Sequence, residues 1–291
     1  MKIHHAVRGA FVFVGLVSIG CGTTAHATST MRSLTTPQAQ PPAVDQVTVP
    51  LTDASKPAVI RVSLVHGSIT VRGTNRRDVL VTAHPDTDRP SGRLDPDAAG
   101  LRRLPQTAGY RVTEENNRVN VSADSPNRAV RFDIEAPRRA NLVLRTVNGG
   151  NILVENVDGD LDVHNTNGGI TLNSVAGSVV AVTTNGSVHA TLTQVTPQKD
   201  MAFTSLNGSV DVTLPPSTKA NLRLRSDHGD VYSDLDVQLQ PLSAPTVQEN
   251  TRGDGRYRIN RTRSVVGTIN GGGPEFELRT FNGNVYVRKG R

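Results

Sequence analysis

Glycine recurs every nine residues in the middle of the chain, at Gly159, Gly168, Gly177 and Gly186. Apolar or small residues follow each glycine at the second and fourth places, and this alternation indicates a short, half-buried strand. Asn or Asp often precedes the glycine, and such pairs accept a positive φ at low cost, so they predict corners. The residue two places before the glycine alternates between Val and Thr. We therefore expect a full repeat of eighteen residues, with two strands and two corners.

The constant spacing favours a parallel β-solenoid (β-helix), in which every coil is alike and equivalent residues stack in columns. Strands stacked about 4.8 Å apart would pair their backbones with the coils above and below. The apolar columns would then form one continuous interior, with contacts between nearest neighbours only. An antiparallel meander with Asn-Gly hairpins is the alternative, but it does not require a fixed apolar phase at every corner.

The chain divides into three predicted parts. Residues 1–27 form a signal peptide with a basic start, an apolar stretch and an Ala25-His26-Ala27 cleavage site. Val17 to Cys21 also resembles a loose bacterial lipobox, so lipidation of Cys21 remains open beside simple cleavage. Residues 28–57 are rich in Pro, Gln and Thr and indicate a flexible tether. Residues 58–291 form the solenoid, with insertions near 85–109 and 238–256.

The repeated phrases add a resemblance. LRTVNGGNILVENVDGDLDVHNTNGGITL, SLNGSVDVTLPP and TINGGGPEFELRTFNGNVYVRK resemble a bacterial family of adhesin-like β-strand-repeat proteins, a domain of unknown function, and the head domains of auto-transporter adhesins. The resemblance covers about residues 58–291. It implies an exported envelope β-solenoid, and it implies no catalytic residue.

Charge and composition restrict the partners. The chain has 32 Lys and Arg against 26 Asp and Glu, a net charge of +6, and only 3% aromatic residues. A basic envelope protein can contact envelope polysaccharide, lipopolysaccharide or a surface glycan. Nucleic acid is not expected, because a single-strand binder needs stacking aromatics. Membrane contact is expected only through a lipid anchor. The predicted location is the periplasm, outer membrane, cell surface or exterior.

We expect a non-enzymatic adhesion, ligand-binding or scaffold module with no cofactor. The alternative is a β-helix enzyme acting on acidic polysaccharide. In the predicted register, an outward column three places after the glycines contains Thr171, His189, Asp211 and Tyr232. His189 and Asp211 would then serve as a base and its orienting partner.

Two further patterns concern ion binding. Arg256, Arg258, Arg261 and Arg263 alternate and indicate a basic patch, either a charged edge that prevents strand pairing or an anion site. The histidines lack metal-ligand spacing, and the corners lack the repeated aspartates of calcium-binding nonapeptides. No metal is therefore predicted.

Overall fold

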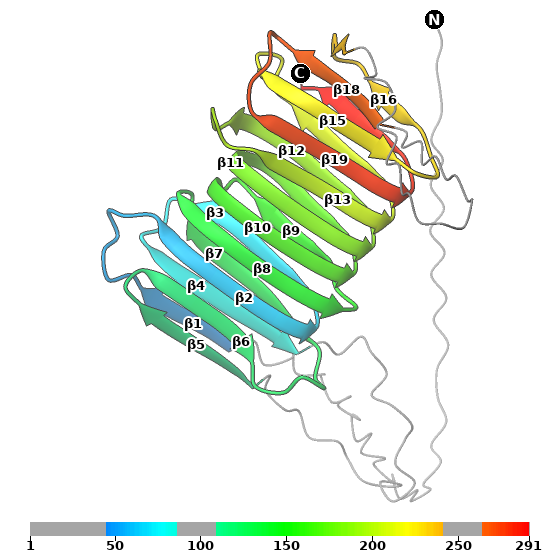
Figure 1. Ribbon diagram of the computed structural model, residues 1–291. Helices are drawn as coiled ribbons and strands as arrows, with labels where there is room; N and C mark the ends of the chain where they lie inside the picture. Colours follow the sequence, from blue (N-terminus) through cyan, green and yellow to red (C-terminus); the bar gives the residue numbers. More distant parts are fainter. Residues whose placement is uncertain (1–44, 86–108, 241–263, 291) are drawn as a thin grey trace, which may run out of the picture. The chain divides into compact units, whose positions relative to one another are not determined.

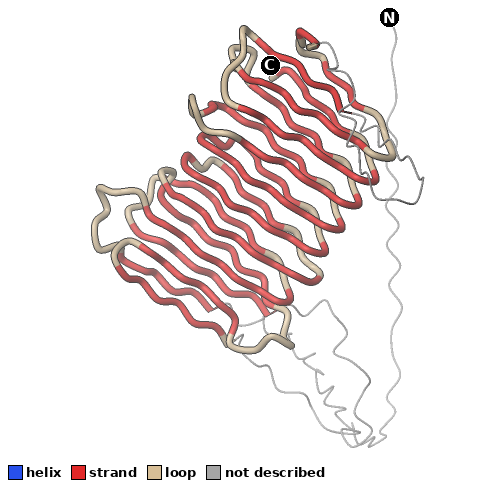
Figure 2. The backbone as a smooth tube through the Cα atoms, in the orientation of Figure 1, coloured by secondary structure: helices blue, strands red, loops and turns tan. Residues whose placement is uncertain are grey.

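The computed structural model describes residues 45–85, 109–240 and 264–290, which all lie in one compact unit, Pro41–Arg291. Strands and turns make up these residues (Figure 2), and the described ranges contain no helix long and apolar enough to cross a membrane. The predicted all-β class is confirmed.

Twenty strands carry the described part of the chain (Figure 1). The first ten are β1 (Asp45–Pro50), β2 (Ala58–His66), β3 (Ile69–Thr74), β4 (Asp78–Pro85), β5 (Tyr110–Glu115), β6 (Arg118–Ala123), β7 (Val130–Pro137), β8 (Ala140–Asn148), β9 (Ile152–Glu155) and β10 (Asp158–Asn167). The others are β11 (Ile170–Asn185), β12 (Val188–Val195), β13 (Met201–Asn207), β14 (Val210–Leu214), β15 (Ala220–Ser226), β16 (Val231–Ser233), β17 (Gln238–Leu239), β18 (Ser264–Ile269), β19 (Glu275–Asn282) and β20 (Val285–Lys289).

One repeat consists of two strands joined at an Asn-Gly turn. β10 runs into the turn at Gly168 and continues as the first part of β11, whereas the second part of β11 runs into the turn at Gly186 and continues as β12. Equivalent strands of successive repeats pair in parallel, so that Gly159 lies beside Gly177 and Val163 beside Ala181. The offset is eighteen residues, the length of the predicted repeat.

The parallel pairings form two series that meet in β11. The first series runs β6–β2–β8–β10–β11–β13–β19–β15. The second series runs β7–β3–β9–β11–β12–β14–β20–β16. Each repeat therefore contributes one strand to each series.

The order of repeats in space departs from the order in sequence at both ends. β2 and β3 lie between the pair β6/β7 and the pair β8/β9. Likewise β19 and β20, the last strands of the chain, lie between β13/β14 and β15/β16. Only the middle, from β8 to β14, stacks in chain order. The expectation that coils follow one another along the whole sequence does not hold.

Antiparallel strands cover both ends of the stack, which differs from a uniformly parallel arrangement. β1 pairs with β4, β4 with β7 and β5 with β6 at one end. β18 pairs with β15 and β17 with β18 at the other. The physical reason is that a terminal repeat has backbone groups and an apolar face with no following repeat to pair with, so it needs a different covering element.

The core follows from the alternation within each strand. Val163, Ala181, Phe203 and Leu278 occupy equivalent positions on neighbouring strands of the first series and are fully buried. Each large aliphatic or aromatic side chain buried in this way contributes about 1.5–3 kcal/mol. The apolar pairs predicted to face inward from residue 161 to residue 190 are buried as well.

Glycine is required at the turns because successive turns touch. Gly208 has a φ of +155°, and a Cβ added to it would lie 2.2 Å from the carbonyl oxygen of Gly186 in the neighbouring repeat. This distance is far below any real Cβ contact, and the obstructing atom is backbone. The backbone amide of Gly208 also donates to the carbonyl of Asn282, at 2.9 Å. A side chain at this position would therefore push two repeats apart.

Ordered structure begins earlier than the predicted boundary at residue 58. β1 lies within residues 28–57, which we expected to form a flexible tether. Val47 and Val49 alternate with polar residues, and Val49 is buried against the core. This short alternation was visible in the sequence beside the Pro- and Gln-rich stretch. Most of the two predicted insertions, and the whole predicted signal peptide, lie outside the described residues.

Candidate functional site

The second series presents an outward column of side chains. Its register places Thr171 beside His189, His189 beside Asp211, Asp211 beside Tyr286, and Tyr286 beside Tyr232. We call these five residues the outward column. The structure thus brings Thr171, His189 and Asp211 onto adjacent strands. Tyr286 separates Asp211 from Tyr232.

Asp211 is engaged by a cation. Arg288 Nε lies 2.8 Å and 3.1 Å from the two carboxylate oxygens of Asp211, and this hydrogen bond, followed by the charge of Asp211, raises the pKa of Arg288. His189 is exposed on the neighbouring strand, and no hydrogen bond joins its ring to Asp211 in the described part of the chain. The Asp211 carboxylate therefore pairs with Arg288 and does not orient the His189 imidazole.

Two tyrosine rings stack at the end of the outward column. The ring centroids of Tyr232 and Tyr286 are 5.3 Å apart and their planes differ by 12°. Arg288 lies over the Tyr286 ring, 5.1 Å from its centroid. Ring stacking and the cation–π contact each contribute about 0.5–1.5 kcal/mol at such sites. The cluster is consequently held as a unit on the strands β20 and β16.

Polar contacts fix both tyrosine hydroxyls. Asn284 Nδ2 donates to the Tyr286 hydroxyl at 2.9 Å, and the Tyr232 hydroxyl donates to Asp230 Oδ2 at 3.3 Å. Asn284 Oδ1 in turn accepts from the backbone amide of Asp230 at 3.0 Å. The charge of Asp230 raises the pKa of Tyr232, so this tyrosine stays neutral throughout the physiological range.

The Asn-Gly turns form a second candidate surface through a ladder of asparagines. In this Asn ladder each Nδ2 donates to the Oδ1 of the asparagine on the preceding repeat, at 2.7–2.9 Å. Its members are Asn148, Asn167, Asn185, Asn207 and Asn282. At one end Asn148 Nδ2 approaches His66 Nε2 at 3.5 Å. The side-chain amides therefore satisfy one another instead of reaching toward a ligand.

A further ladder lies inside the same turns. The residue two places before each ladder asparagine is buried, and its polar side chain donates to a glycine carbonyl of the neighbouring repeat. The hydroxyl donors are Thr146, Thr183, Ser205 and Thr280, at 2.7–3.1 Å. This geometry explains the Thr-x-Asn-Gly phrase. The Thr hydroxyl donates to a glycine carbonyl inside the turn, and the Asn side chain continues the Asn ladder outside it. The Gly allows the backbones of neighbouring turns to approach closely.

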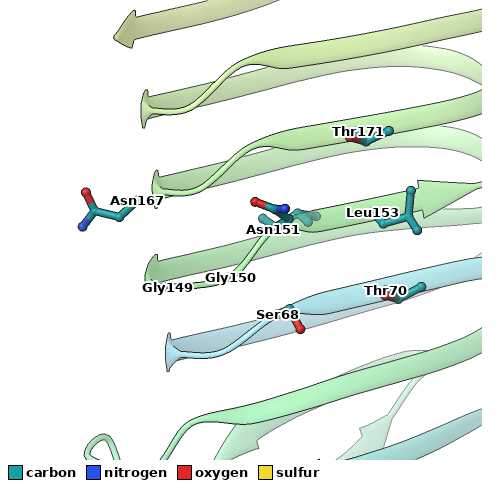
Figure 3. A pocket seen from close by; sticks show the side chains of 9 residues that line it. Ser68, Thr70, Gly149, Gly150, Asn151, Leu153, Asn167 and Thr171 are labelled. Atoms are coloured by element: carbon teal, nitrogen blue, oxygen red, sulfur yellow. The ribbon is translucent and has the colours of Figure 1, made fainter. Parts of the chain in front are cut away.

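A shallow depression of about 510 Å³ lies where these turns meet the second series (Figure 3). Residues 149–151 form its floor with the outward side chains of Thr70, Leu153 and Thr171. Asn167 points outward at its rim (Figure 3). Asn151 Oδ1 accepts from the backbone amide of Gly169 at 2.9 Å. The residues that line the depression carry no charge, and the Asn167 amide is already paired within the Asn ladder, so the tyrosine end of the outward column offers more for recognition.

The remaining predicted site residues are not placed. Cys21 and the patch Arg256, Arg258, Arg261 and Arg263 lie outside the described residues. Among the residues that are described, no group of three or more His, Cys, Asp or Glu side chains is arranged to hold a metal ion.

Sequence reasoning missed Tyr286 and the pairing of Arg288 with Asp211. The signal was available, because Tyr286 stands three places after Gly283, as His189 stands three places after Gly186. Its neighbours were hidden, since β20 lies between β14 and β16 although it comes last in the chain.

The comparison with protein families identifies the kind of chain. The family model described as Toastrack DUF4097 matches residues 115–285, more than half of the 291 residues. No curated protein matches the sequence.

Two solved structures are similar at low identity. A "putative cell adhesion protein" from Clostridium sporogenes is 9% identical, with a TM-score of 0.48 over 86% of this chain and 100% of that one. A "putative adhesin" from Bacteroides fragilis is 12% identical, with a TM-score of 0.39 over 85% of this chain and 97% of that one. On the family match, the chain belongs to the Toastrack DUF4097 family, in line with the predicted adhesin-like family of unknown function.

Proposed function

We propose that this chain is an exported cell-envelope module of the β-solenoid type that acts by binding and not by catalysis. Its partners would be envelope polysaccharide, lipopolysaccharide or another surface glycan. The two series of parallel strands support this proposal, because they hold outward side chains at fixed positions on a rigid frame. Fixed side chains lower the entropy lost on binding.

The observation that carries the proposal is the state of Asp211. A histidine that acts as general base needs a partner that orients its ring, which is the role expected of Asp211. Asp211 instead receives both contacts from Arg288 Nε. The outward column therefore offers aromatic, hydroxyl and ion-paired groups, which suit recognition, but among the described residues Asp211 gives the His189 ring no orienting hydrogen bond.

The test is retention of ligand by the full chain. In one experiment we would apply the full chain to a glycan array. In a second experiment we would immobilise the chain on a resin and pass solubilised bacterial envelopes over it. Retention of a defined glycan in the array or of envelope polysaccharide supports the proposal. If no envelope material is retained on the resin and no glycan is bound in the array, the adhesive version is contradicted. A purely structural role then remains, for which deletion of the protein should alter envelope integrity without changing attachment.

A carbohydrate-active enzyme is the second candidate, because His189 and Asp211 do lie on adjacent strands. It would cleave acidic polysaccharide. An activity screen with polyuronates decides the matter, with His189→Ala as the variant and Thr171→Ala as the matched control on the neighbouring strand. Cleavage lost in the first variant and kept in the second would establish the enzyme.

Export is proposed from the sequence of residues 1–27. Mass spectrometry of the mature N-terminus separates its two forms. An acylated Cys21 identifies a lipoprotein, whereas a free Thr28 identifies ordinary secretion. A chain that keeps Met1 after expression in a bacterial host contradicts export.

A further inference from the structure

We propose that the exposed ring face of Tyr232 is a stacking platform for a neutral pyranose sugar. This inference rests on the proposed binding function and names its site and ligand class. Tyr232 belongs to β16, which pairs with β20 and with no other strand among the described residues. The ring stack that passes through Tyr286 therefore ends at Tyr232.

The end of the stack is accessible. Tyr232 is 49% exposed, although one side of its ring rests on Tyr286. Tyr286 itself is only half-buried between its two neighbours. A tyrosine that stacks on one face and remains half-exposed presents its other face as an apolar plane of fixed orientation. An isolated exposed apolar side chain is common on protein surfaces and requires no functional explanation. A half-exposed ring held in a fixed orientation does require one.

The platform is organised before any ligand arrives. The Tyr232 hydroxyl donates to Asp230, the Tyr286 hydroxyl accepts from Asn284, and Arg288 lies against the Tyr286 ring. Each ring thus has at least one face and its hydroxyl engaged, so little side-chain rotational freedom remains to be lost on binding. Rigid tyrosines provide contact area at low entropic cost for this reason.

The groups around the ring indicate a sugar. A pyranose has an apolar C–H face that packs on an aromatic ring and a rim of hydroxyls that need acceptors and donors. Asp230 and Asp234 lie within two residues of Tyr232 and are exposed. Of the Asp230 carboxylate oxygens, one receives the tyrosine hydroxyl, and the other can accept from a sugar hydroxyl. An acceptor beside an aromatic face matches both surfaces of the ligand.

The charge of this end argues for a neutral sugar. Asp230, Asp234 and Asp236 are exposed, and they outnumber the exposed Lys289, whose backbone amide donates to Asp234. Arg288 is occupied by Asp211. A polyuronate would bring further carboxylates toward these aspartates. A second copy of the chain stacked through its own Tyr232 would do the same. Like-charge contacts of this kind are strongly unfavourable at an interface, so the aspartates select against both occupants.

The test is a titration of the full chain followed by tyrosine fluorescence. The chain has no Trp and four Tyr, so a sugar that stacks on Tyr232 changes a small signal that tyrosine alone produces. The probes are cellopentaose and chitopentaose as neutral oligosaccharides, and an oligogalacturonate as the acidic one. We expect saturable binding of a neutral probe and weaker binding of the acidic probe.

Three variants locate the binding, and each is titrated by isothermal calorimetry because replacing Tyr232 removes the fluorescent reporter. Tyr232→Ala should weaken the neutral probe about tenfold, since loss of one stacked ring is worth about 1.4 kcal/mol. Tyr232→Phe keeps the ring and should stay within about threefold of the wild type. Phe281→Ala removes another exposed aromatic side chain, 39% exposed, whose ring packs against His228 and not against the two stacked tyrosines, and should leave the affinity unchanged.

The outcomes separate this inference from the proposed function. If the wild type binds a glycan and Tyr232→Ala binds it equally well, the platform is wrong and the binding function stands. Tighter binding of the oligogalacturonate than of either neutral probe also overturns the platform. If the wild type retains nothing in the titration, the array or the envelope experiment, both fail.

Discussion

Replacing Thr183 by valine removes one hydroxyl from the inside of a turn and keeps the shape of the side chain. Thr183 is 2% exposed, and its Oγ1 donates to the carbonyl oxygen of Gly168 at 2.8 Å. The variant loses this hydrogen bond and leaves the carbonyl without it, at a cost of about 1–3 kcal/mol. The added methyl group recovers at most about 0.8 kcal/mol. We therefore expect a net loss of about 1–2 kcal/mol.

The assay is thermal and urea unfolding followed by circular dichroism. For a domain of this size, 1 kcal/mol corresponds to about 2–4 °C, so Thr183→Val should lower Tm by about 2–8 °C. Thr184→Val is the matched control, because Thr184 is adjacent, half-exposed and outside the inner ladder. Its effect should stay within about 0.5 kcal/mol. Equal stability of the two variants would refute the capping role assigned to the Thr of Thr-x-Asn-Gly.

Three other predictions follow from the same geometry. Gly208→Ala should cost about 2 kcal/mol or more in urea unfolding, because its Cβ would meet the Gly186 carbonyl oxygen at 2.2 Å; an unchanged midpoint would contradict the close approach. Hydrogen bonds from Ser55 lower the pKa of Asp53 from 3.8 to about 2, so its contribution to stability is present above pH 3.8 and is lost as the pH falls toward 2. Asp53→Asn should therefore flatten the dependence of Tm on pH between 4 and 2, and an unaltered profile would oppose this assignment. His189→Ala should leave binding of neutral oligosaccharides within about twofold, and a larger loss would extend the platform along the outward column.

The sequence predicted the eighteen-residue spacing because local chemistry determines it, although Gly159 and Gly177, which we expected at corners, lie inside β10 and β11. Gly168 and Gly186 mark turns, and the alternation around them places Leu161 and Val163 in the core. Even the placement of His189 beside Asp211 on adjacent strands could be counted from the glycines, since both lie in the middle of the stack where repeats follow chain order.

The order of the outer repeats could not be read in the same way. Each strand has the same alternation of apolar and polar residues. The pattern therefore predicts that a strand is stacked, but it does not predict which strand lies next to it. Arg288 reaches Asp211 across 77 residues because β20 enters between β14 and β16. This insertion also placed Tyr286 against Tyr232, the contact on which the proposed platform depends.

The most direct test of the binding account is saturation-transfer difference NMR with the full chain and the neutral oligosaccharide that binds best. Irradiation of the aromatic protons should transfer saturation most strongly to the C–H protons on one face of a single pyranose ring, and this transfer should vanish with Tyr232→Ala and persist with Tyr232→Phe. Transfer spread evenly over the sugar, or unchanged when the Tyr232 ring is removed, would contradict recognition at the end of the tyrosine stack.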